Sequence, residues 1–400
     1  MLALNAGRWS IEMRTVTSQK EASHFFKRTI LTGCWLLLFF PRSNFAQSWT
    51  WTTETVDPFG VQASIAVDKD DNLHVSYFSG GVKYGFRPAN STRWFTMNLA
   101  PASGYSEIPT RLALDPAGNP HICFTPGVLK YASFENHKWN VQQIDPQSGL
   151  IEYNCSVAIG ADGTPHILWY QYGNSQGGYY LHLKYASLQK GSWIARTVDY
   201  GMQSGKWNCM VLDAQGHPHV TYDVFTRGEM KYAYWDGKDW QRTLLDSPDI
   251  SPNVSTGGTG NSLVLNHDGK AQVSFESGDL LKYSWEKDGT WKTETIDHPA
   301  LSGSWAGYRT RQALDPQGNP HLVYEDGGAL KHAYRDGSNW KIQIVAAAGT
   351  RWHRYQDIAI DAQGNIYIIY SDPIDGALKV AIGHPQAQVE STSNEKKPAE

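Results

Sequence analysis

A pattern that recurs seven times constrains the fold of this chain more than any other feature. Each copy begins with a short apolar segment ending in Asp, Asn or Gly, and continues through a tight turn into a second apolar segment. Gly and Asn in these turns tolerate the positive φ angles of a tight hairpin, so each copy predicts two antiparallel strands. The copies lie 45 to 53 residues apart and begin at Ser64, Arg111, Ser156, Cys209, Ser262, Arg311 and Asp357.

Two further strands follow in each copy. A lysine preceded by Val, Leu or Met marks the third strand in all seven copies: Lys83, Lys130, Lys184, Lys231, Lys282, Lys331 and Lys379. A tryptophan opens a fourth strand in six of them: Trp94, Trp139, Trp193, Trp240, Trp291 and Trp340. Four antiparallel strands in a repeat of about 40 to 50 residues are typical of one β-propeller blade.

The two ends of the repeated region complement each other. The last copy stops after Leu378-Lys379-Val380 and has no fourth strand, whereas residues 51–57, Trp-Thr-Thr-Glu-Thr-Val-Asp, precede the first copy and resemble residues 291–297. A strand from the N-terminal end can therefore complete the last blade and remove the exposed edges of an open array. We predict an all-β fold, a seven-bladed β-propeller with four antiparallel strands per blade, closed by its N-terminal strand.

The residues before the propeller have the order of a secretory leader. Lys27 and Arg28 precede an apolar run at residues 30–40, which at about eleven residues is shorter than the roughly 20 needed to span a bilayer. We expect a leader at 1–46, the propeller at 47–384 and a disordered polar tail at 385–400, in a secreted, periplasmic or cell-surface protein. Leu31-Thr32-Gly33-Cys34 resembles a lipobox, but most of the apolar run follows Cys34, which disfavours a lipid anchor.

Composition excludes some partners. The chain has 35 Lys and Arg against 39 Asp and Glu, a net charge of −4, which disfavours nucleic acid and anionic membranes as partners. Beyond the leader only Cys123, Cys155 and Cys209 remain, so disulfides are not the framework; buried thiols or one bridge between adjacent strands stay open. We expect no cofactor, and a monomer.

Residues repeated in every blade are interpreted as structural, because seven equivalent positions seldom share one active site. We expect each lysine to pack its stem between blades and to place its ammonium on a turn carboxylate such as Asp68 or Asp115. A histidine opens the second strand of five copies: His74, His121, His166, His219 and His321. Spread round a ring, these imidazoles cannot converge on one ion, so we expect no metal site.

The variable loops predict the functional face. The turns between strands one and two and between strands three and four are short and uniform, whereas the loops on the opposite face vary in length. Aromatic, basic and acidic residues gather in or next to the variable loops, a composition suited to stacking on sugar rings and bonding hydroxyl or carboxylate groups. The candidate ligand-binding residues are Arg111, Trp207, Trp305, Tyr308, Arg309, Arg311, Glu325, Asp326, Trp352, His353, Arg354 and Tyr355. The alternative is that these aromatics seal gaps between blades and the arginines pair with nearby acids.

A resemblance narrows the class of propeller. The segments 236–240, 288–291 and 336–340, such as Asp-Gly-Lys-Asp-Trp, resemble the Asp-box turns of BNR-repeat propellers, a group that includes sialidases, although one residue between Asp and Gly is missing. The equal, Trp-marked blades are also similar to those of secreted bacterial propeller lectins. The sialidase resemblance implies an arginine triad, for which Arg111, Arg311 and Arg354 are candidates, but the sialidase segment Phe/Tyr-Arg-Ile-Pro is absent.

Three functions follow as hypotheses. The first is a secreted recognition protein that binds carbohydrate, or another cell-surface ligand, through the variable-loop face without catalysis. The second is a glycan-active enzyme, a sialidase-like hydrolase or a polysaccharide lyase, using arginine, His353 or Tyr355 with Glu325 or Asp326. The third is a non-catalytic scaffold at the cell surface.

Overall fold

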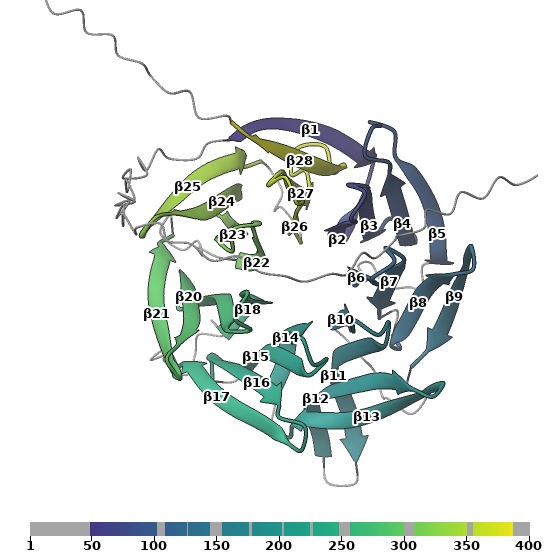
Figure 1. The fold of residues 1–400 in the computed structure, drawn as a ribbon, viewed down its shortest axis with the longest axis vertical. Coiled ribbons are helices and arrows are strands. Elements are labelled where there is room, and N and C mark those ends of the chain that lie inside the picture. The colour runs from purple at the N-terminus through teal and green to yellow at the C-terminus, as the bar shows by residue number, and fades with distance from the viewer. Residues whose placement is uncertain are drawn as a thin grey trace, which may run out of the picture. The chain divides into compact units, whose positions relative to one another are not determined.

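The chain forms a closed ring of seven four-stranded antiparallel sheets (Figure 1). The computed structural model describes residues 49–101, 109–125, 127–144, 154–175, 178–201, 204–224, 227–247, 257–299, 308–349 and 355–386, with the backbone alone at 172–175, 178–181, 206, 257–259 and 308. The first strands of neighbouring blades contact one another from β2 through β6, β10, β14, β18, β22 and β26 back to β2. The predicted β-propeller is confirmed.

Within blades 1 to 6 the strands follow the chain from the axis outward (Figure 1). Blade 1 comprises β2 (Val61–Val67), β3 (Leu73–Phe78), β4 (Gly81–Arg87) and β5 (Phe95–Pro101), and blade 2 comprises β6 (Thr110–Leu114), β7 (Pro120–Phe124), β8 (Lys130–Glu135) and β9 (Lys138–Gln143). Blade 3 comprises β10 (Cys155–Ile159), β11 (Pro165–Ser175), β12 (Gly178–Gln189) and β13 (Ser192–Asp199), and blade 4 comprises β14 (Ser204–Leu212), β15 (Pro218–Val224), β16 (Glu229–Trp235) and β17 (Trp240–Asp246). Blade 5 comprises β18 (Gly257–Leu265), β19 (Ala271–Ser277), β20 (Leu280–Lys287) and β21 (Thr290–Asp297), and blade 6 comprises β22 (Tyr308–Leu314), β23 (Pro320–Asp326), β24 (Ala329–Asp336) and β25 (Asn339–Ala346). Blade 7 comprises β26 (Asp357–Ile360), β27 (Ile366–Ser371), β28 (Leu378–Pro385) and, as its outer strand, β1 (Trp49–Asp57).

The N-terminal strand closes the ring as predicted. β1 pairs antiparallel with β28 from Trp49 opposite Pro385 to Asp57 opposite Leu378. In Figure 1 the first and last strands of the chain, purple and yellow, lie side by side at one point of the ring. The leader at 1–46 and all but the first two residues of the tail at 385–400 lie outside the described residues, so both stay predictions.

The apolar core lies between blades. The second strands β3, β7 and β27 are buried at every position, and each hydrophobic cluster joins side chains of two neighbouring blades. In most blades the tyrosine after the repeated lysine packs edge-on against the next blade's tryptophan, with ring centroids 5.0 Å apart for Tyr84 and Trp139 and 5.6 Å apart for Tyr185 and Trp240. The tryptophans are thus contacts between blades.

Four of the repeated lysines, at 83, 231, 282 and 331, bind carboxylates other than the predicted ones. Lys83 donates to Asp57 at 2.9 Å, and Lys331 donates to Asp297 at 2.9 Å. Asp57 and Asp297 end the outer strand of the preceding blade, and each also accepts a hydrogen bond from a tyrosine of the lysine's own blade. For these four lysines the prediction of a carboxylate such as Asp68 or Asp115 was wrong, and both of those aspartates accept hydrogen bonds from their own turns. These four lysines instead join blades 1, 4, 5 and 6 to the blade before each. Lys184 and Lys379 bond within their own blades, to Thr197 and to Asp372 and Asp375.

The turn aspartates lie beside the second-strand histidines. Asp115 accepts hydrogen bonds from the amides of Ala117 and Asn119 and from the Asn119 side chain. The Nε2 atom of His121 lies 3.6 Å from the same carboxylate, and its Nδ1 atom bonds the Tyr131 hydroxyl. Within the described ranges no group of three or more His, Cys, Asp or Glu side chains is arranged to hold a metal ion.

One disulfide joins two blades. Cys123 of β7 and Cys155 of β10 are bonded, and their Cα atoms lie 6.2 Å apart, whereas Cys209 is a free thiol. Of the two alternatives left open by the sequence, the structure therefore has one bridge, which crosses from blade 2 to blade 3. No helix long and apolar enough to cross a membrane occurs in the part of the chain that the structure describes.

Candidate functional site

Charged residues of the first strands converge on the axis of the ring. Arg111, Cys209, Arg311 and Asp357 occupy the same repeat position in blades 2, 4, 6 and 7. Burial lowers the pKa of Arg111, while the charge of Asp357 opposes this shift and the charge of Arg309 adds to it. Arg111, Cys209 and Asp357, from blades 2, 4 and 7, are thus close enough to interact electrostatically.

Two groups of blade 1 bind the carboxylate of Asp357. Its Oδ2 atom accepts hydrogen bonds from the Ser64 hydroxyl at 2.7 Å and the Ile65 amide at 3.2 Å, so the carboxylate also ties blade 7 to blade 1. Burial raises its pKa, an effect that Arg111 and these hydrogen bonds oppose. The sequence had not singled out Asp357 as a site residue, although it shares the repeat position of Arg111 and Arg311.

An aromatic and arginine stack lies two residues earlier along the chain in blades 4, 6 and 7, toward the variable-loop face. The guanidinium carbon of Arg309 lies 3.5 Å from the ring centroid of Tyr355 and 5.6 Å from that of Trp207. The two rings lie 6.4 Å apart at an angle of 42°. Three of the predicted residues, from blades 4, 6 and 7, are thus brought into one half-buried cluster, the Trp207–Arg309–Tyr355 stack.

Two irregularities of the backbone, positive φ angles and a β-bulge, occur at the residues of this stack. Arg309 and Tyr355 have φ angles of 55° and 61°, in the left-handed region that non-glycine residues rarely adopt. β22 carries one extra residue opposite β23 between Tyr308 and Arg311, a bulge that turns a side chain out of the regular strand alternation. Such strained positions persist only where neighbours over-determine them and cluster at binding sites.

Side chains of neighbouring blades restrain the backbone of Arg309 and Trp207. The Gln356 side chain of blade 7 donates to the carbonyl oxygen of Arg309 at 2.9 Å, and the Asn261 side chain of blade 5 donates to that of Trp207 at 3.1 Å. At the matching position of blade 5, a Cβ atom on Gly260 would lie 2.3 Å from the Cα atom of Arg309, so only glycine allows this approach. Gln356 and Asn261 therefore restrain the backbone of Arg309 and Trp207, and Gly260 leaves the space that the backbone of Arg309 occupies.

A buried carboxyl group lies beside the stack. Glu325, near the end of β23, is fully buried, and neither carboxyl oxygen has a hydrogen-bond partner among the described residues. Burial raises its pKa to about 8; Arg309 opposes this shift and Asp326 adds to it. At neutral pH the group is therefore largely protonated, a state suited to donating a proton or a hydrogen bond.

The neutral state of Glu325 makes the stability of the protein depend on pH. Below about pH 4.5 the group is protonated in both the folded and the unfolded chain, and as the pH rises toward 8 only the unfolded chain loses the proton, which lowers stability. Glu325→Gln should therefore gain stability relative to the parent between pH 5 and pH 8, by roughly 2 to 4 kcal/mol. Denaturant titrations at the two pH values measure this; Glu135→Gln, at an exposed site, is the control. A gain for Glu325→Gln that is equal at both pH values would contradict the assignment.

Other predicted residues bond the framework. The Nη1 atom of Arg311 donates to the carbonyl oxygens of Asn261 and Thr310 at 2.7 and 3.1 Å, and Asp326 accepts from Lys331 at 2.7 Å. Trp305, Trp352, His353 and Arg354 lie outside the described residues, as does the side chain of Tyr308, so these stay predictions.

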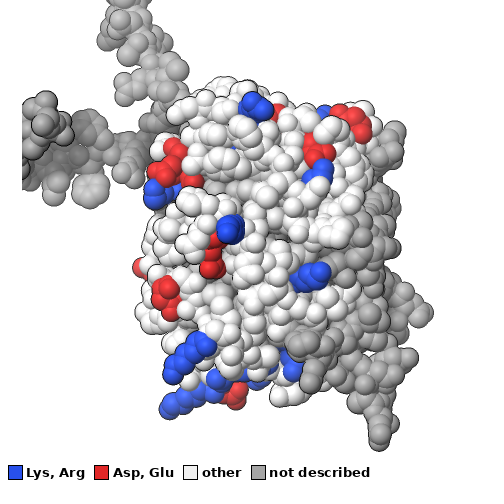
Figure 2. Space-filling model, turned by 90° about the vertical axis from the view of Figure 1, so that its right-hand side faces the viewer, with Lys and Arg blue, Asp and Glu red and all other residues white. Residues whose placement is uncertain are grey.

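The surface charge is mixed. Figure 2 shows Lys and Arg side chains interspersed with Asp and Glu over the visible side of the molecule, with no large field of one sign. This agrees with the net charge of −4.

Comparisons with known proteins support the architecture. No family model and no curated protein matches the chain. Among solved structures, it is similar to a protein of unknown function from Dyadobacter fermentans, with 11% identity, a TM-score of 0.50, and coverage of 84% of this chain and 98% of that one. It is also similar to the polysaccharide lyase Uly1, with 12% identity, a TM-score of 0.52, and coverage of 82% and 90%. These likenesses show a shared fold.

Proposed function

We propose that this protein binds an acidic glycan near the axis of the ring, on the variable-loop face. The observation that carries the proposal is the Trp207–Arg309–Tyr355 stack, in which the guanidinium of an arginine contacts two aromatic rings. Aromatic faces pack against sugar rings, and a guanidinium oriented by stacking bonds a carboxylate with little loss of conformational entropy. Arg111 and Arg309 are close enough for their charges to oppose each other, and a bound carboxylate would relieve that repulsion.

Arg309→Ala should weaken binding of an acidic glycan about 10- to 100-fold and shift the melting temperature little, because a recognition surface depends on a few anchors. A glycan array carrying neutral, uronate-containing and sialylated glycans identifies the probe, and calorimetric titration then compares the variants. Arg335→Ala is the matched control: Arg335 belongs to the same blade and also stacks on aromatic rings, but lies in β24, away from the axis. Equal binding by all three proteins would overturn the proposal.

A second candidate is a glycan-active enzyme at the same site, a polysaccharide lyase or hydrolase. Glu325 favours it, since a buried carboxyl group with a pKa of about 8 keeps its proton at neutral pH and can deliver it to a leaving oxygen. The fold it shares with a polysaccharide lyase is compatible with this role. Release of unsaturated or reducing sugar ends by the parent and its loss in Glu325→Gln, with binding retained, would establish catalysis; a protein that neither binds nor cleaves would be a scaffold.

We also propose that the protein works outside the cytoplasm. The basic and apolar order of residues 27–40 supports this, and so does the Cys123–Cys155 bridge, because disulfides persist in oxidising compartments. Mass spectrometry of the protein from culture medium, periplasm and cytoplasm, without a reductant, would locate it and report the bridge.

A further inference from the structure

Four blades share one arrangement at the turn between their first two strands. A turn aspartate lies 3.3 to 3.6 Å from the Nε2 atom of the second-strand histidine, in the pairs Asp68–His74, Asp115–His121, Asp213–His219 and Asp315–His321. The Nδ1 atom of the imidazole bonds a tyrosine hydroxyl in three of these blades. Because a carboxylate only accepts, the histidine carries its proton on Nε2 and accepts on Nδ1.

Blade 3 lacks one member of this arrangement. Gly160 stands where other blades have the turn aspartate or asparagine, while His166 keeps its bond from Nδ1 to the Tyr185 hydroxyl at 2.6 Å. The carboxylate of Asp162, two residues later, closes the turn instead by accepting from the amide and hydroxyl of Thr164. No hydrogen bond or ion pair joins the Nε2 atom of His166 to any side chain in the described part of the chain.

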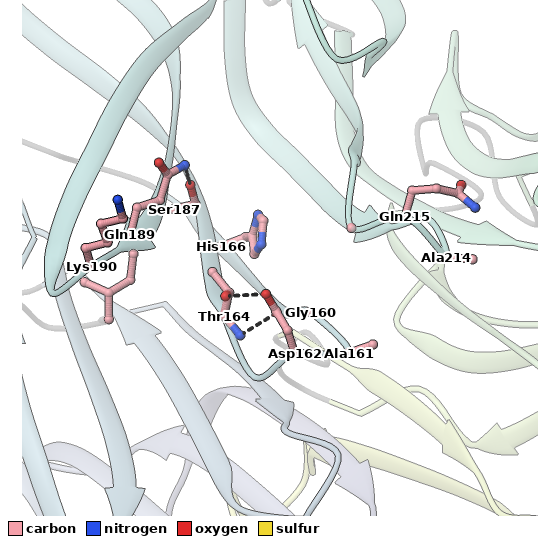
Figure 3. Close-up of a pocket in the computed structure, with 12 residues that line it drawn as sticks. Gly160, Ala161, Asp162, Thr164, His166, Ser187, Gln189, Lys190, Ala214 and Gln215 are labelled. Carbon is pink, nitrogen blue, oxygen red and sulfur yellow. Dashed lines mark hydrogen bonds between the residues drawn. The ribbon is translucent and has the colours of Figure 1, made fainter.

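A hollow occupies the space beside this histidine. It has a volume of about 500 Å³ and lies between the turns of blades 3 and 4, on the face opposite the Trp207–Arg309–Tyr355 stack. Figure 3 shows His166 between the Ser187–Lys190 segment on one side and Gln215 on the other, with the Asp162 and Thr164 side chains below it. This volume is within the roughly 300 to 1,000 Å³ of small-molecule sites.

The groups around the hollow suit a neutral ligand with several hydroxyls, because the Asp162 carboxylate and the Lys190 ammonium in its lining balance each other and the other polar groups are uncharged. Burial lowers the pKa of His166, an effect that Asp162 opposes, so the imidazole is neutral and offers an N–H donor. A carboxylate ligand would meet the negative charge of Asp162, whereas a hydroxyl can accept from Nε2 and donate to Asp162 at once. Gln189 and Gln215 are exposed amides at the two walls and can bond further hydroxyls.

We propose that the hollow between blades 3 and 4 is a second binding site, which takes a neutral polyhydroxylated ligand such as a monosaccharide or polyol through His166 and Asp162. Gly160 leaves the Nε2 atom of His166 available to a ligand. An aspartate at position 160 would place a carboxylate beside this atom, as in the four blades that have the aspartate–histidine pair. This site is separate from the proposed acidic-glycan site and does not depend on it.

The test gives blade 3 the turn sequence of another blade. The variant Gly160→Asp/Asp162→Gln/Thr164→Asn gives blade 3 the sequence Asp-Ala-Gln-Gly-Asn found at residues 361–365 of blade 7. Saturation-transfer NMR with glucose, galactose, mannose and inositol should detect binding of at least one of them to the parent, and the variant should bind it at least about tenfold more weakly, as expected for a lost hydrogen-bond partner. The melting temperature should not fall, since the new turn is one that the fold already uses.

Two further variants keep the test decisive. Gln215→Ala changes only an exposed side chain at the blade 4 wall and should also weaken binding if the hollow is the site. Gln363→Asp makes the reverse change in the blade 7 turn, and, like Arg309→Ala, should leave binding of the neutral ligand unchanged. Absence of binding of all four compounds to the parent, or unchanged binding by the restored variant, would overturn the proposal. Loss of neutral-ligand binding in Arg309→Ala alone would assign the neutral ligand to the Trp207–Arg309–Tyr355 stack and overturn the proposal.

Discussion

Deleting residues 49–57 should abolish the cooperative thermal transition of the whole propeller. β1 is the outer strand of blade 7, so its removal exposes the full edge of β28, takes Trp49 and Val56 out of two hydrophobic clusters and removes Asp57 from Lys83 and Tyr77. An unpaired edge also invites pairing between molecules. Scanning calorimetry should find no transition at the parent's melting temperature, and light scattering should find aggregates.

The deletion has two controls. Removing residues 392–400, which follow the end of β28, should leave the melting temperature within a few degrees. A synthetic peptide of residues 49–57, added to the truncated protein during refolding, should restore part of the transition, because it can supply the missing strand. A truncated protein that melts like the parent would show that blade 7 is stable with three strands.

Trp240→Ala should destabilise the protein by about 3 to 5 kcal/mol, the usual cost of truncating a buried tryptophan. The Trp240 side chain is 3% exposed and packs between blades 3 and 4, with its ring centroid 5.6 Å from Tyr185 and 5.7 Å from Trp235. The cavity left by alanine would open the interface between the two blades. Urea titration monitored by circular dichroism measures the change.

Leu244→Ala is the control for this substitution. Leu244 lies in the same strand, β17, but is 53% exposed, so its truncation should change the free energy of unfolding by less than about 0.5 kcal/mol. A loss below about 1 kcal/mol for Trp240→Ala would mean that the tryptophans contribute little to the contacts between blades.

The architecture could be predicted because its evidence is repeated. Turn, lysine and tryptophan recur at one spacing, and the unmatched strands at the two ends leave one way of closing the ring. The partners of the lysines could not be obtained from the repeat alone, because a turn carboxylate and an outer-strand carboxylate look equivalent until their other hydrogen bonds are known. The aspartates at 57, 199, 246 and 297 were visible in the sequence, and each proves to contact the next blade's lysine.

The candidate site was predictable in part. Trp207, Arg309 and Tyr355 lie two residues before the aligned first-strand position, so the repeat itself places them at one level along the axis of the ring. The protonated state of Glu325 was not predictable, because it depends on burial by segments distant in sequence. The sequence does show a glycine at position 160, where other blades have aspartate or asparagine. It did not indicate a site beside His166, because the aspartate partners of the other histidines were not known from the sequence.

The pairing of β1 with β28 also sets the order in which the molecule can be completed. Trp49 is among the first propeller residues to leave the ribosome, and its partner Pro385 is among the last. Six blades can form from contacts close in sequence, but blade 7 joins contacts separated by nearly the whole domain, which are slow to form. Until synthesis reaches β28, a growing chain carries β1 without its partner strand, so the strand made first waits for the strand made last.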